Sequence, residues 1–128
     1  KPYAGVLELM AALKAEGFRL AVVSNKPDRT TRTLAARFFP ELDGAMGQRE
    51  GIASKPAPDM VRAALDQLHA APEEALYVGD SEVDVATARN AGLDMIGVAW
   101  GFRGRAALEA AGAPLVADTP EQLLDMLQ

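Results

Sequence analysis

The chain has 128 residues, a net charge of -5 and no cysteine. A chain of this length buries roughly two-thirds of its unfolded surface, which is enough for one domain. Without cysteine, disulfides and thiolate metal sites are excluded, and an acidic chain is not expected to bind nucleic acid, which normally requires a basic patch. No apolar run approaches the roughly 20 residues of a membrane span, and the first residues lack the pattern of a signal peptide. We therefore expect one domain over residues 1–128, without a membrane partner and in the cytoplasm by default.

The first half of the chain alternates between helix and strand patterns. Gly17 follows an apolar helical face and is suited to a left-handed helix end. That face consists of Val6, Leu9, Met10 and Leu13, which predicts a helix over residues 4–15. The uninterrupted apolar run over residues 19–25 predicts a strand that is covered on both faces. The elements expected next are a helix over 28–39, a short strand over 44–47 and a helix over 56–68 with Pro58 in its first turn.

The second half continues the same alternation. The elements expected here are strands over 75–80, 95–100 and 114–118 and helices over 82–90, 105–112 and 119–128. Thr119 and Gln122 have the spacing of a capping box at the start of the last helix, with Pro120 at its first position. Strands that alternate with helices of about ten residues favour an α/β domain in which helices flank a parallel sheet.

Polar side chains follow the predicted strands at the edge where such sheets bind ligands. Ser24 and Asn25 end the first strand, Asp80 follows a later strand, and Lys55 stands alone before Pro56. A serine hydroxyl and backbone amides that open onto a helix favour a bound anion. The proline biases Lys55 away from helical geometry, so we expect this lysine on a loop that faces the site.

Two carboxylates complete the pattern. Asp80 and Asp84 are four positions apart and supply hard oxygen ligands, which suit Mg²⁺ held by one or two carboxylates together with waters and a substrate phosphate. An anion cradle, a lysine and a magnesium site at one sheet edge favour phosphate chemistry. We therefore expect a small phosphorylated metabolite as the partner of this site.

Each of these residues also has a structural interpretation. Ser24 and Asn25 could be turn residues, Lys55 could be a solvated surface lysine, and the two acids could belong to the cap and first turn of the next helix. The coincidence of all three features at matching ends of an α/β domain favours the functional interpretation. His69 at a helix end and Trp100 after a strand are expected to have structural roles.

Three stretches of the sequence resemble motifs of a known family. The stretches "LAVVSNKP", "SKPAPDM" and "YVGDSEVDVATARNAG" are similar to the second, third and fourth motifs of the haloacid dehalogenase superfamily, in the order and spacing of phosphoglycolate phosphatases. The resemblance implies a Rossmann-like core and Mg²⁺-dependent hydrolysis of small phosphomonoesters. It further implies that Ser24 and the Asn25 amide hold the transferring phosphoryl group and that Lys55 neutralises charge on nucleophile and phosphate. Asp80 would bind Mg²⁺ directly, and Asp84 would support the metal or orient Lys55.

The sequence departs from the family in one respect. In the family, the nucleophile and the general acid/base are the aspartates of an Asp-x-Asp motif on an N-terminal strand, which an inserted cap follows, and this sequence contains no Asp-x-Asp. We therefore expect a carboxyl-terminal, partial core domain that is inactive alone, because the aspartyl-phosphate would form on a residue outside it. The family's sheet places the nucleophile strand between the strands that lead to Ser24 and Asp80, so both should have an unpaired edge here.

Two other interpretations remain open at this point. A non-catalytic fragment could use the same anion site as a binding or regulatory module. A receiver-type signalling domain also combines Mg²⁺, acids and a lysine on a doubly wound sheet. The order of residues disfavours the receiver, which would carry acids near its first strand and its lysine near the last.

Overall fold

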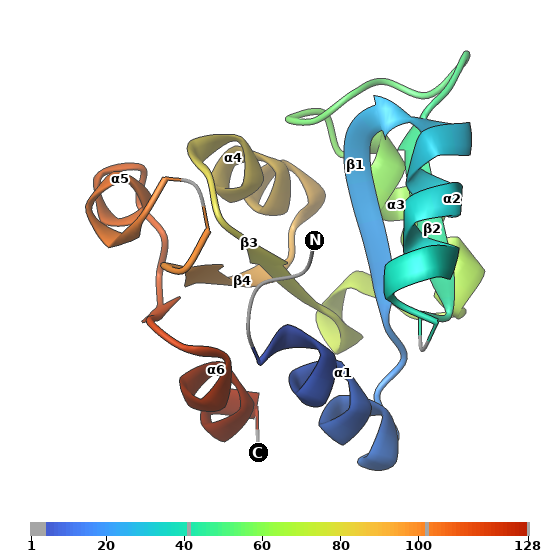
Figure 1. Cartoon of the computed structure of the whole chain (residues 1–128). Helices are drawn as coiled ribbons and strands as arrows, with labels where there is room; N and C mark the ends of the chain where they lie inside the picture. Colours follow the sequence, from blue (N-terminus) through green and yellow to red (C-terminus); the bar gives the residue numbers. More distant parts are fainter. Residues whose placement is uncertain (1–4, 41, 102, 128) are drawn as a thin grey trace.

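Strands and helices alternate along the whole described chain, as the sequence predicts (Figure 1). The structure is a computed structural model, and it describes residues 5–40, 42–101 and 103–127. The helices are α1 Val6–Ala15, α2 Asp28–Phe38, α3 Asp59–Leu68, α4 Glu82–Ala91, α5 Arg105–Ala110 and α6 Pro120–Leu127, with a 3₁₀ turn over Pro72–Glu74. The strands are β1 Ala21–Pro27, β2 Gly44–Gln48, β3 Leu76–Gly79, β4 Asp94–Val98 and β5 Val116–Ala117. The predicted α/β class is therefore confirmed.

The strands form two separate parallel sheets. One sheet pairs β1 with β2, and the other has the order β3-β4-β5. In the described part of the chain β1 pairs only with β2 and β3 only with β4, so the two inner strands are not hydrogen-bonded to each other. Figure 1 shows β1 and β3 as the strands of the two sheets that lie nearest the middle of the molecule. The prediction that these two strands have unpaired edges is confirmed.

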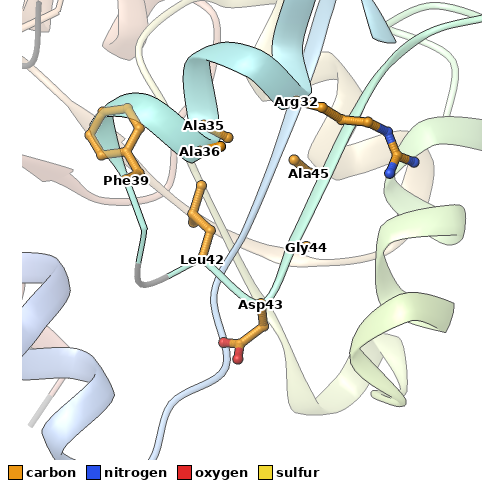
Figure 2. Close-up of a pocket in the computed structure, with 8 residues that line it drawn as sticks. All are labelled: Arg32, Ala35, Ala36, Phe39, Leu42, Asp43, Gly44 and Ala45. Carbon is orange, nitrogen blue, oxygen red and sulfur yellow. The ribbon is translucent and has the colours of Figure 1, made fainter. Parts of the chain in front are cut away.

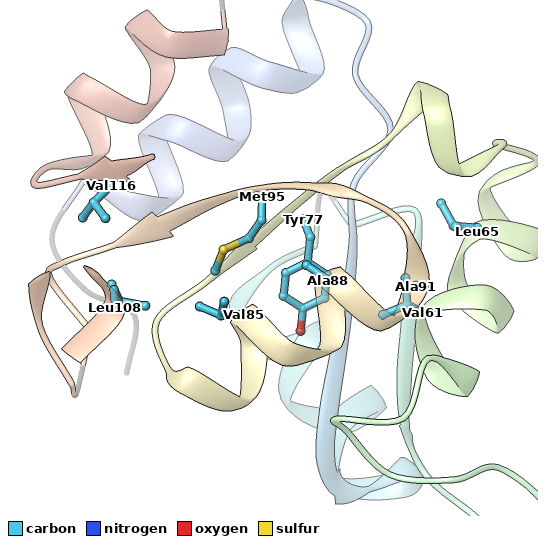
Figure 3. Close-up of a cluster of buried hydrophobic side chains, with 9 residues drawn as sticks. All are labelled: Val61, Leu65, Tyr77, Val85, Ala88, Ala91, Met95, Leu108 and Val116. Atoms are coloured by element: carbon cyan, nitrogen blue, oxygen red, sulfur yellow. The ribbon is translucent and has the colours of Figure 1, made fainter. Parts of the chain in front are cut away.

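Helices cover both faces of the larger sheet. On one face, β3, β4 and β5 pack against α3, α4 and α5 in a cluster that contains Tyr77, Met95 and Leu108 (Figure 3). On the other face, Ile96 and Val98 of β4 pack against α1 and α6. Successive residues of β4 thus enter opposite cores, which is why its sequence is apolar without alternation.

Most predicted boundaries hold within a few residues, and the differences have local causes. The helix α3 begins at Asp59, with Pro58 as its N-cap residue, because the Pro58 carbonyl accepts the bond from Arg62 N that opens the helix. The prediction that Pro58 lies in the first turn is therefore wrong by one position. Trp100 packs against the α1 and α6 side of the core, and His69 ends α3 in a left-handed conformation, as their structural assignments predicted.

The predicted capping box at α6 forms only in part. The Thr119 hydroxyl accepts a hydrogen bond from Gln122 N at 3.1 Å, as expected. The Gln122 side chain, however, accepts from Asp118 N at 2.6 Å, one residue before the position that a capping box requires. None of the helices in the described ranges has the length and apolar character that a bilayer span would need.

Candidate active site

The end of β1 is irregular where the sequence places Ser24 and Asn25. The strand continues to Pro27 instead of ending at Asn25, and its register against β2 shifts between Val23 and Pro27. Such irregularities free backbone groups from the ladder and are common beside active sites. The Ser24 hydroxyl accepts a bond from Lys26 N at 3.1 Å within this irregular end of the strand. The structure gives Ser24 no direct bond to the other predicted residues.

The loop that contains Lys55 and Pro56 is attached to two separate elements. The Asn25 side chain accepts from Lys55 N at 2.8 Å and donates to Lys55 O at 3.2 Å, so β1 binds this loop as another strand would. On the other side, Asn90 of α4 donates to the Pro56 carbonyl at 2.8 Å. Lys55 thus lies on a loop that faces the site, as predicted. The sequence did not indicate Asn90, because a surface asparagine late in a helix carries no distinctive signal.

The Asp84 carboxylate is buried and accepts hydrogen bonds on both oxygens. Its Oδ1 accepts from Lys55 Nζ at 2.9 Å and from the Tyr77 hydroxyl at 2.7 Å. Its Oδ2 accepts from Asp80 N at 3.0 Å and from the Ser81 hydroxyl at 3.2 Å. Of the two roles left open for Asp84, this geometry favours the orientation of Lys55 over direct contact with a metal ion.

The electrostatics keep Asp84 ionised. Burial alone would raise the pKa of Asp84, but the charge of Lys55 and the hydrogen bonds from Lys55, Tyr77 and Asp80 N together hold this pKa below its usual value. Burial, followed by the nearby Asp84 charge, raises the pKa of Tyr77. At neutral pH the tyrosine is therefore a protonated donor and the aspartate a charged acceptor.

Two glycines make room for the two carboxylates. A Cβ atom on Gly79 would lie 2.3 Å from the Asp84 Cβ, and one on Gly101 would lie 2.3 Å from Asp80 Oδ2. Both separations are too short for any side chain, so each acid lies directly over a glycine backbone. Gly101 was not predicted as part of the site, because its contact with Asp80 joins segments that are distant in the sequence.

The described residues do not by themselves form a complete metal site. No three histidine or acidic side chains among them are grouped so that they could hold a metal ion. Mg²⁺ is commonly held by one or two carboxylates, with waters and substrate phosphate as its other ligands. The Asp80 carboxylate at the end of β3 is a hard oxygen ligand of the kind such a site uses. The Asp84 oxygens each accept two hydrogen bonds from the protein. The residues present thus fit a metal site to which Asp80 contributes and which needs further ligands.

Two hollows in the described part of the structure lie away from these residues. One has a volume of about 170 Å³ between α2 and β2, and alanine side chains form much of its wall (Figure 2). The charged residues at its rim, Arg32 and Asp43, form ion pairs with Asp28 and Lys14. The other, of about 390 Å³, is an apolar groove that includes Leu76 at the start of β3. Neither hollow includes a residue of the candidate site.

Comparison with known proteins identifies the family of the chain. The sequence profile of the family described as haloacid dehalogenase-like hydrolase matches residues 1–98. The chain belongs to the haloacid dehalogenase-like hydrolases, as its motifs predicted.

Alignments with individual relatives show what share of their length this chain covers. It is 38% identical over 128 residues to the phosphoglycolate phosphatase of Rhodospirillum rubrum, covering 98% of this chain and 52% of that protein. It is 33% identical over 130 residues to the pyrophosphatase PpaX of Bacillus mycoides, covering 98% of this chain and 59% of PpaX. A crystal structure from Lactobacillus delbrueckii subsp. bulgaricus, provisionally assigned as a phosphoglycolate phosphatase, has 42% identity and a TM-score of 0.95 over 98% of this chain and 53% of its own. The chain thus spans about half the length of the curated relatives it matches.

Proposed function

We propose that this chain is the carboxyl-terminal core of a Mg²⁺-dependent phosphatase that hydrolyses small phosphomonoesters of the phosphoglycolate kind. The observation that carries the proposal is the Lys55 ammonium, held 2.9 Å from a buried carboxylate beside the ends of β1 and β3. A cation fixed in this way is suited to a phosphoryl group, which carries negative charge throughout its transfer. The phosphatase and pyrophosphatase relatives support a phosphorylated substrate.

Each residue of the chain has a limited task in the proposed reaction. Ser24 and the backbone amide of Asn25 bind oxygens of the phosphoryl group, and Lys55 offsets the negative charge that gathers as the nucleophile approaches. Asp80 holds Mg²⁺, which when bound offsets phosphate charge and orients the ester. Asp84 keeps Lys55 in place.

The nucleophile is assigned to a segment outside these 128 residues. A carboxylate oxygen there forms the bond to phosphorus as the ester P–O bond breaks, and a neighbouring acid protonates the departing alcohol. Water then cleaves the aspartyl-phosphate. Asp84 is unsuited to the attack because its oxygens already accept hydrogen bonds.

The test uses the full-length protein that carries these residues, assayed with phosphoglycolate and Mg²⁺. Lys55→Met should lower kcat by about 100-fold or more, as loss of a positioned charge-stabilising donor does. Lys14→Met is the matched control, because Lys14 also forms an ion pair, with Asp43, but lies away from the site. It should leave kcat near the wild-type value. Ser24→Ala provides a second variant with less effect on folding, since the Ser24 hydroxyl accepts only a local bond from Lys26 N.

Two results would contradict the proposal. Unchanged turnover in both Lys55→Met and Ser24→Ala would remove these residues from the reaction. A full-length protein that binds inorganic phosphate but hydrolyses no phosphomonoester would support the non-catalytic binding module instead.

A further inference from the structure

Tyr77 combines a core position with a polar contact to the site. It is the second residue of β3, its side chain is 7% exposed, and its ring lies in the apolar cluster of Figure 3. Its hydroxyl donates to Asp84 Oδ1 at 2.7 Å. Buried tyrosines usually direct the hydroxyl to a partner. Here the partner is the carboxylate that also holds Lys55.

The shared oxygen couples the tyrosine to the lysine. Asp84 Oδ1 accepts from both the Tyr77 hydroxyl and Lys55 Nζ, and these donors come from a strand and a loop. A lysine side chain has many rotamers and cannot by itself fix the carboxylate. A tyrosine whose ring is packed in the core has few accessible rotamers, so its hydroxyl is held in one position. Asp80 N and the Ser81 hydroxyl hold Oδ2, and the Tyr77 hydroxyl is the contact by which the core holds Oδ1, the oxygen that also binds Lys55 Nζ.

We propose that Tyr77 is a positioning residue: its hydroxyl fixes Asp84 Oδ1 so that Lys55 is held ready for the phosphoryl group. The proposal rests on the function assigned to Lys55 above. Tyr77 itself is too deeply buried to touch a substrate, so its effect on the site passes through Asp84.

The chain supplies a matched pair of variants. Tyr77→Phe removes one buried hydroxyl and keeps the ring in the core. Thr87→Val is the control, because Thr87 is also fully buried and its hydroxyl donates to Val83 O at 2.6 Å, in the same helix as Asp84. Both variants lose one buried hydrogen bond, but only Tyr77→Phe alters the surroundings of Asp84.

Two measurements on the full-length protein test the proposal. The dissociation constant for inorganic phosphate should rise about threefold to tenfold in Tyr77→Phe. The reason is that Asp84 Oδ1 loses the hydrogen bond from Tyr77, so the carboxylate holds Lys55 less firmly. In Thr87→Val it should not change. The ammonium signal of Lys55 in NMR spectra, assigned by its absence in Lys55→Met, should broaden in Tyr77→Phe alone. Equal behaviour of the two variants in both measurements would overturn the proposal.

The experiments distinguish a failure of the proposed function from a failure of the Tyr77 proposal. If Lys55→Met binds phosphate as the wild type does, Lys55 does not face the anion, and the NMR signal still decides whether Tyr77 positions the lysine. Should Tyr77→Phe not fold, 3-fluorotyrosine at position 77 keeps the hydroxyl and changes its acidity. It should then alter the Lys55 signal, and an unaltered signal would count against Tyr77.

Discussion

Asp80 and Asp84 are four residues apart but occupy different environments. Asp84 is buried, with hydrogen bonds to both oxygens, whereas Asp80 is partly exposed at the end of β3, against Gly101. The difference arises because Asp84 lies in the first turn of α4 and points back over Gly79 into the protein. The Asp84 carboxylate is thus held by protein donors, and the assignment of Asp80 to a metal ion stays a prediction.

The environment of Asp84 predicts how stability depends on pH. Its pKa is lower in the folded protein than the value of about 3.9 expected for an unfolded chain. The ionised carboxylate therefore contributes its full stability above the unfolded value, and this contribution is lost as pH falls through the lower, folded value. Urea unfolding of the full-length wild type and Asp84→Asn should show a large difference in free energy at pH 7. That difference should shrink below about pH 4. A difference that stays constant or grows as pH falls would contradict the assignment.

At the scale of elements, the Lys55 loop is fixed by side chains from both of its neighbours. Asn25 forms two bonds with the Lys55 backbone, and Asn90 forms one with Pro56. Side-chain amides can replace strand pairing here because they carry both a donor and an acceptor. The loop therefore joins the smaller sheet to α4 without belonging to either sheet.

This arrangement predicts a local loss of order when the β1 contact is removed. Asn25→Ala takes away the acceptor of the Lys55 amide, so hydrogen exchange at that amide should accelerate by about tenfold or more, as local opening becomes easier. Asn90→Ala is the control, because it leaves the Lys55 amide bonded to Asn25. Equal exchange rates at Lys55 in the two variants would show that the Asn25 contact does not protect the loop.

The sequence predicted elements better than contacts. Apolar periodicity located α1 and β4, because the faces of a helix or strand that are buried determine the spacing of apolar residues along the sequence. The site residues Lys55 and Asp84 were also predicted, but not the bond from Tyr77 that connects them to the core. That bond depends on how α4 crosses β3, which no local pattern encodes. The irregular end of β1 was missed for the same reason, since it depends on the register against β2.

At the scale of the whole molecule, β1 and β3 each have one edge that pairs with no other strand among the described residues. The edge strand β3 also exposes an apolar residue: Val78 is 42% exposed between the buried residues Tyr77 and Gly79. Its register partner Ile96 is buried on the face that α1 and α6 cover. Apolar strands with free edges favour association with other chains. The described residues alone thus leave a surface that a further strand would cover.

We therefore predict that residues 1–128 alone do not form a stable monomer and do not hydrolyse phosphomonoesters. Sedimentation should show association, and urea unfolding should lack the cooperative transition of the longer protein. Addition of a segment that carries an Asp-x-Asp strand should restore cooperative unfolding and activity. A soluble monomer that unfolds cooperatively and is active without that segment would contradict the prediction.

A lysine introduced on β3 can be compared with one introduced at an equally exposed position of α4. Val78→Lys should reduce association of the isolated chain, because lysine on an edge strand opposes pairing with other chains. Val83→Lys is the control, since Val83 is equally exposed at 42% but lies on α4. An equal effect of the two substitutions would place the associating surface elsewhere.

The bonds of the site also have a consequence for the order of folding. Paired strands are close in sequence: Ala21 pairs with Gly44, 23 positions away (44 − 21), and Leu76 with Asp94, 18 positions away (94 − 76). The bonds that attach Lys55 span more chain, with 30 positions between Asn25 and Lys55 and 29 between Lys55 and Asp84. Closing a longer loop costs more entropy, and contacts between distant positions slow folding. Each sheet can form from neighbouring segments, whereas the Lys55 bonds connect Asn25 of one sheet to Asp84 of α4, which packs on the other. We therefore expect the lysine to reach its carboxylate after the two sheets have formed.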